Sequence, residues 1–131
     1  MPVFVDTNVV VYAFGRDEAK AAISEAILAD QPTVSVQVIS EFLNVCRVKF
    51  GLEIQVRHRL AQELLAGCNV VAIDARVVAK AMEIEREARI AYWDALIVAA
   101  ALLAGCDTLY SEDFQHGYVF ENRLTVVNPF T

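Results

Sequence analysis

The stretch Val3-Phe4-Val5-Asp6-Thr7-Asn8 joins three apolar residues directly to three polar ones near the start of the chain. An apolar run without alternation is typical of a strand buried on both faces, as in a parallel sheet covered by helices. Asp, Thr and Asn often begin helices, because their side chains accept hydrogen bonds from free backbone amides. The stretch therefore predicts a buried strand that ends where a short helix begins.

The same alternation continues along the chain. Short β-branched runs predict strands at 3–5, 33–36, 70–73, 108–111 and 124–127, and longer apolar periodicities predict helices at 8–12, 16–30, 38–50, 54–66, 74–89 and 93–104. Strands joined by helices form right-handed crossovers into a parallel sheet with helices on both faces. We therefore expect residues 1–131 to form one α/β domain, a three-layer α/β/α sandwich with a central parallel sheet of about five strands.

The composition limits the class of protein. Hydrophobic residues make up 56% of the 131 residues and charged residues 21%, which excludes a disordered chain. The net charge of −6 argues against broad coating of nucleic-acid phosphates. Cys46, Cys68 and Cys106 are too scattered for a disulfide framework or a zinc site and indicate a reducing cytoplasm. The apolar run 95–104 is about half of the roughly 20 residues that span a bilayer, so we expect a buried helix and no membrane segment.

Four carboxylates stand near the edge of the sheet where ligands of such folds bind, the carboxyl ends of the strands. Asp6 and Asp113 follow predicted strands, and Glu41 and Asp94 lie near the beginnings of predicted helices. Each has a structural alternative: a helix cap for Asp6, a mixed helix face for Glu41, a cap or first-turn position for Asp94 and a turn for Asp113.

Four carboxylates that converge at one edge would raise one another's pKa values unless a cation neutralised them. Oxygen-only ligands suit Mg²⁺ or Mn²⁺. Such an ion lowers the pKa of a bound water and stabilises the leaving oxygen, so the group would support phosphodiester hydrolysis.

Four short motifs resemble those of PIN-domain nucleases, in the family's order and over essentially the whole chain: Val-Phe-Val-Asp6-Thr-Asn-Val, Ile-Ser-Glu41-Phe, Tyr-Trp-Asp94-Ala-Leu-Ile and Leu-Tyr-Ser-Glu-Asp113-Phe-Gln-His-Gly. The resemblance is greatest to the VapC-type toxins of toxin–antitoxin pairs. It implies a cytoplasmic, Mg²⁺- or Mn²⁺-dependent endoribonuclease that cuts single-stranded or loop RNA. It also implies inhibition by a cognate antitoxin protein and assembly as a homodimer.

The resemblance also assigns roles to residues. It makes Asp6 and Asp94 the principal metal ligands and catalytic carboxylates, with Glu41 and Asp113 completing the acidic cluster. Asn8 and Ser111 would orient carboxylates or water. Glu112 competes with Asp113 for the last position.

A basic segment separates two of these motifs. Between Asn44 and Leu60 only Glu53 opposes four cations, which are Arg47, Lys49, Arg57 and Arg59. The segment is either a solvated helix face or a surface that contacts the RNA backbone or the antitoxin.

We expect several other residues to lie outside the site. His58, between two arginines, belongs on the surface, and His116 belongs to a turn. Tyr92 and Trp93 adjoin Asp94 and could stack on a nucleobase, but packing in the core is favoured for Trp93. The cysteines are expected to be small core residues.

Other functions fit less well. A receiver domain needs a basic residue near the end of its fifth strand, and a phosphatase with an Asp-x-Asp motif needs an acid where Asn8 stands. A dinucleotide-binding fold needs glycines after the first strand. The alternative that stays open is a catalytically weak PIN-fold module that binds RNA or protein, with a structural acidic cluster.

Overall fold

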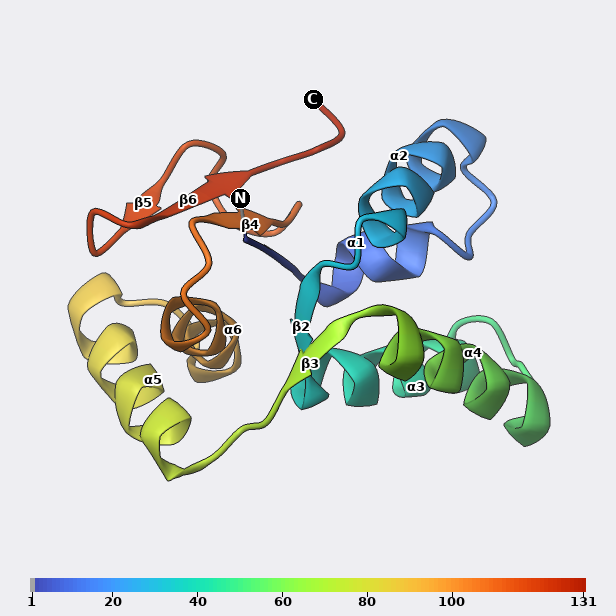
Figure 1. Cartoon of the computed structure of the whole chain (residues 1–131), viewed down its shortest axis with the longest axis horizontal. Coiled ribbons are helices and arrows are strands. Elements are labelled where there is room, and N and C mark those ends of the chain that lie inside the picture. The colour runs from blue at the N-terminus through green and yellow to red at the C-terminus, as the bar shows by residue number, and fades with distance from the viewer. Residues whose placement is uncertain (1) are drawn as a thin grey trace.

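The computed structural model describes residues 2–131, which form six helices and six strands (Figure 1). The strands are β1 (Val3–Val5), β2 (Thr33–Ser35), β3 (Asn69–Val71), β4 (Thr108–Tyr110), β5 (Val119–Phe120) and β6 (Leu124–Val127). The helices are α1 (Thr7–Tyr12), α2 (Glu18–Ala29), α3 (Val36–Val48), α4 (Ile54–Gly67), α5 (Ala75–Ala88) and α6 (Tyr92–Leu103). The six predicted helices and five predicted strands are confirmed, with ends that differ by one or two residues.

The strands form one sheet in the order β3-β2-β1-β4-β6-β5. All neighbouring pairs are parallel except β5 with β6, so the predicted parallel sheet is confirmed with one antiparallel strand added. The sequence did not predict β5, because two residues are too few to show a strand period. A tight turn at Glu121 and Asn122, both at positive φ (52° and 57°), returns the chain to β6.

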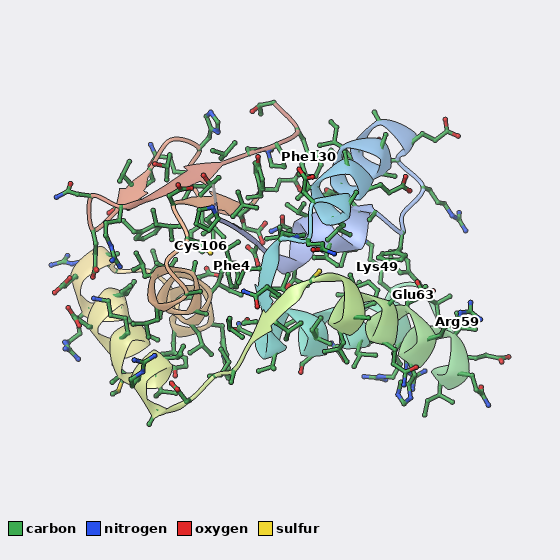
Figure 2. The ribbon with its side chains drawn as sticks, in the orientation of Figure 1. Phe4, Lys49, Arg59, Glu63, Cys106 and Phe130 are labelled. Carbon is green, nitrogen blue, oxygen red and sulfur yellow. The ribbon has the colours of Figure 1, made fainter. Side chains whose placement is uncertain are left out.

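The helices cover the sheet in two layers. Figure 1 shows α5 and α6 together on one side of the strands and α1 to α4 on the other, which confirms the three-layer α/β/α architecture. Helix α6 is buried from Ala95 to Leu102, as its apolar sequence predicted. Phe4 and Cys106 lie in the middle of the molecule in Figure 2. In the part of the chain that the structure describes, no helix has the length and apolar character needed to cross a bilayer.

This topology places several chain segments at one edge of the sheet. Strands β1, β2 and β4 are parallel, so their carboxyl ends lie at that edge. Helix α3 begins directly after β2. Helix α6 leads back to the start of β4, so its first turn also lies at the carboxyl edge.

Candidate metal centre

The four predicted carboxylates line one open cleft of about 1720 Å³. Asp6 joins β1 to α1, Glu41 lies in the second turn of α3, Asp94 lies in the first turn of α6, and Asp113 follows β4. Residues more than 100 positions apart in the sequence are thus brought together at the carboxyl edge of the sheet. Small-molecule pockets measure roughly 300–1,000 Å³, so this cleft is large enough for a polymer.

Asp6 is held more firmly than the other three. Its side chain is 6% exposed and caps α1, with Oδ1 accepting a hydrogen bond from the Thr7 backbone amide at 2.7 Å. Its Oδ2 accepts hydrogen bonds from Ser111 Oγ at 2.8 Å and Asn8 Nδ2 at 3.2 Å. Asn8 and Ser111 therefore contact the carboxylate that they were expected to orient. The capping role and a place in the cleft are compatible.

Burial changes the acidity of Asp6. Desolvation raises the pKa of Asp6 from its ordinary value of 3.8 to about 6, against the hydrogen bonds from Ser111 and Thr7, which lower it. The negative charges of Asp113 and Glu41 raise the pKa further. The hydrogen bonds of the protein therefore compensate the burial of the charged form of Asp6 only in part.

Glu41 is fixed by two residues, Thr7 and Gln37, that the sequence pattern did not single out. Thr7 Oγ1 donates a hydrogen bond of 2.6 Å to Glu41 Oε1, and Gln37 Nε2 donates one of 3.4 Å to Oε2. Thr7 stands between Asp6 and Asn8 in the first motif, and Gln37 precedes Glu41 by one helical turn. The helical spacing could have revealed Gln37, but only the fold brings Thr7 to Glu41.

Asp94 and Asp113 complete the cluster from exposed positions. Partial burial raises the pKa of Asp94, and the charges of Asp113 and Glu41 raise it further. Ala91, not Asp94, is the N-cap of α6, so Asp94 is a first-turn residue. The backbone amide of Asp113 donates a 3.1 Å hydrogen bond to Ser111 Oγ, which also holds Asp6.

Glu112 points elsewhere. Its Oε1 accepts a hydrogen bond from Tyr12 Oη at 2.7 Å, and its Oε2 pairs with Lys20 Nζ at 2.7 Å. These contacts, led by the Lys20 ammonium, lower the pKa of Glu112. Since Asp113 lines the cleft and Glu112 does not, the geometry favours Asp113 as the fourth carboxylate.

Within the described residues, no carboxylate of the cluster forms an ion pair with a protein cation. Among residues 2–131 the ion pairs are Lys20 with Glu112 and Lys80 with both Glu83 and Glu121, and none of them involves a carboxylate of the cluster. The chemistry of the donors fits a hard divalent cation, since all four are carboxylates and the most buried one has a raised pKa. In the described residues, no three of the cluster's carboxylates place oxygens within 4.8 Å of one another.

A second group of acidic residues, outside the cleft, has its carboxylate oxygens close enough together to share a cation. Oxygens of Glu83, Glu87 and Glu121 lie within 4.8 Å of one another, on α5 and the turn after β5. Lys80 Nζ lies 3.6 Å from Glu83 and 2.6 Å from Glu121. This group already has a protein cation, and it lies outside the cleft.

The structure divides the basic segment in two. Lys49 and Arg59 line the cleft, on the side formed by α3 and α4 in Figure 2. Arg47 donates a hydrogen bond to Asn44 Oδ1 and Arg57 donates one to the Leu52 carbonyl, and neither lines the cleft. Arg16 also lines the cleft, and nothing in the sequence pattern singled it out.

The expectation that Trp93 packs in the core is wrong, because its side chain is 66% exposed at the rim of the cleft. The fully buried part of α6 begins only at Ala95, and in the first turn Tyr92 packs against the core while Trp93 does not. Of the cysteines, Cys46 and Cys106 are buried as expected, and Cys68 is half-buried.

The two histidines lie where they were expected. His58 is exposed on α4. His116 is also exposed, and its Nδ1 accepts a hydrogen bond from the Asn128 amide at 2.9 Å, which fixes the segment after β4.

The fold and the cleft together define a class of protein. Its members are single α/β/α domains whose parallel sheet carries, at its carboxyl edge, a cluster of carboxylates that form no ion pair with a protein cation. The sequence model of the PIN domain matches residues 3–119, so the chain belongs to the PIN domain family. No curated protein matches the chain.

Several solved structures are similar to the chain in fold. FitAcB from Neisseria gonorrhoeae is 20% identical with a TM-score of 0.73, and each chain is covered to 98%. A toxin–antitoxin complex from Klebsiella pneumoniae is 25% identical with a TM-score of 0.70 and the same coverage. VapC20 of Mycobacterium tuberculosis, a toxin that cleaves the sarcin–ricin loop, is 19% identical with a TM-score of 0.68, over 85% of this chain and 89% of its own.

Proposed function

We propose that the chain is a Mg²⁺- or Mn²⁺-dependent endoribonuclease and the toxin of a toxin–antitoxin pair. The observation that carries the proposal is the convergence of Asp6, Glu41, Asp94 and Asp113 on one cleft, where none of them forms an ion pair with a cation of the described residues. Membership of the PIN domain family and the toxins of similar fold support it. The antitoxin and a second copy of the chain are the proposed protein partners.

The residues of the cleft would divide the work of hydrolysis. A bound divalent ion supplies a water of lowered pKa and stabilises negative charge on the phosphate. Asp6 and Asp94 would hold the ion with Glu41 and Asp113, while Asn8 and Ser111 fix the orientation of Asp6. Water adds to phosphorus, the bond to one ribose oxygen breaks, and that oxygen leaves with a proton.

Lys49 and Arg59 would contact the RNA backbone beside the cluster. Two cations on one side of the cleft attract a phosphate chain without coating the whole surface with positive charge. This arrangement reconciles RNA cleavage with the net charge of −6.

Cleavage of a labelled single-stranded RNA by the purified chain tests the proposal. We expect cleavage with Mg²⁺ or Mn²⁺, none with a chelator, and a loss of about 100-fold or more in Asp6→Asn and Asp94→Asn. Products should lack 2′,3′-cyclic phosphates, because water and not the ribose hydroxyl attacks. Circular dichroism establishes that the variants are folded. A folded wild-type chain that binds RNA or antitoxin but cleaves nothing with either metal would instead indicate a binding module.

A further inference from the structure

We propose that Trp93 is a stacking platform for an unpaired nucleobase next to the scissile phosphate. The inference rests on the proposed function, because it takes RNA as the substrate. It adds what the acidic cluster cannot supply, namely a way to distinguish an unpaired nucleotide from a base-paired one.

The exposure of Trp93 is unusual for its position. At 66% it is the most exposed of the large apolar side chains described, although the helix that follows is buried. Leaving an indole in water forgoes the free energy of burying one of the largest apolar side chains. Its neighbour Asp94 belongs to the acidic cluster, and both residues line the cleft.

Trp93 is also anchored to the cluster. Gln37 Nε2 donates a hydrogen bond of 3.1 Å to the Trp93 carbonyl and one of 3.4 Å to Glu41 Oε2. The Tyr92 ring meets the indole edge-on, with centroids 5.4 Å apart and planes at 74°. The backbone that carries the indole is thus tied to a carboxylate of the cluster, as a preorganised binding group requires.

The chemistry of an exposed indole selects for unpaired bases. Aromatic side chains stack on any nucleobase, because every base has a π-face. In a duplex both faces are covered by neighbouring base pairs. A phosphate at the cluster therefore brings the base of an adjoining nucleotide to Trp93 only if the strand is single or looped out.

Trp93 is the only tryptophan in the chain, so its fluorescence reports on this ring alone. In the Asp6→Asn protein with Mg²⁺, we expect a single-stranded 12-nucleotide RNA to quench the emission and the same RNA in a duplex to leave it unchanged. Equal quenching by the duplex would overturn the inference. So would RNA binding, measured by filter retention, without quenching. A change on dilution of the protein alone would place Trp93 between two copies of the chain and overturn it as well.

Kinetics provide the second test. We expect Trp93→Ala to raise KM for single-stranded RNA about tenfold with a smaller change in kcat, and Trp93→Phe to stay within about threefold of wild type. Val48→Ala, at a side chain that is 65% exposed outside the cleft, is the matched control and should change neither constant. An active enzyme whose KM is unchanged in Trp93→Ala would overturn this inference alone. A wild-type chain that cleaves nothing, but whose fluorescence is quenched by single-stranded and not by duplex RNA, would overturn the proposed function and still support stacking of an unpaired base on Trp93.

Discussion

Asp6 shows how one residue serves the fold and the candidate site at once. One carboxylate oxygen caps α1 and the other accepts hydrogen bonds from Asn8 and Ser111, so the side chain has a single orientation. All three donors are neutral, so they orient the carboxylate without supplying a positive charge. A metal ion would supply it, and that is the physical reason to place the ion here.

Thr7 is a positioning residue for Glu41, through its 2.6 Å hydrogen bond. We expect Thr7→Val to raise the Mg²⁺ concentration for half-maximal cleavage by roughly tenfold, as for other residues that orient metal ligands, and to keep kcat at saturating metal nearer to wild type. Thr125→Val in β6 is the control, because Thr125 pairs with the first residue of β4 and does not line the cleft. An unchanged Mg²⁺ dependence in Thr7→Val would show that this contact does not position the ligand.

The choice between Glu112 and Asp113 is open to a paired substitution. We expect Asp113→Asn to reduce cleavage at least tenfold, because it removes a carboxylate from the cleft. Glu112→Gln should leave cleavage within about threefold and lower the Tm slightly, since exposed ion pairs contribute little. The reverse pattern of cleavage rates would make Glu112 the fourth carboxylate.

Among the elements, most of the architecture could be predicted from the sequence, because short runs rich in β-branched residues alternate with longer helical stretches. The predicted positions of Asp6 and Asp113 in the fold are also those of the structure, since Asp6 directly follows β1 and Asp113 comes shortly after β4. The contacts of Glu41 with Thr7 and of Gln37 with Trp93 could not be predicted, because they join elements that meet only in the folded chain. Trp93 was misplaced because its apolar neighbours suggested a buried turn.

Helices α3 and α4 provide a prediction about the basic segment. Reversing the charge of Lys49 and Arg59 together, Lys49→Glu with Arg59→Glu, should weaken RNA binding by at least tenfold and reduce its salt dependence, because both line the cleft. Arg47→Glu with Arg57→Glu, which makes the same change in net charge in the same segment but outside the cleft, is the matched control. Equal weakening by the control would mean that net charge, and not position, governs RNA binding, which filter retention at several salt concentrations can measure.

At the scale of the whole molecule, the acidic cluster links stability to pH. The pKa of Asp6 is raised from 3.8 to about 6 in the folded state, so folding favours the protonated form. The contribution of Asp6 to the free energy of unfolding is therefore fully present below pH 4 and is lost as the pH rises to about 6. The loss is about 3 kcal/mol at most, from 1.36 kcal/mol per unit of pKa.

Comparison with Asp6→Asn isolates this contribution from other carboxylates such as Glu112, whose lowered pKa acts in the opposite sense. With a chelator present, we expect the Tm of wild type to fall relative to that of Asp6→Asn as the pH rises from 4 to 6. Mg²⁺ at pH 7 should raise the Tm of wild type and not of the variant. A difference in Tm that does not depend on pH would show that Asp6 does not titrate in this range.

If the carboxylates of the cleft form one divalent-metal centre, calorimetry at pH 7 should detect Mn²⁺ binding by the wild-type chain. We expect this binding to be weakened at least tenfold in Asp6→Asn and in Asp94→Asn and to be unchanged in Glu87→Gln, from the acidic group beside Lys80. Binding that is lost in Glu87→Gln but retained in Asp6→Asn and Asp94→Asn would show that the metal centre is not in the cleft.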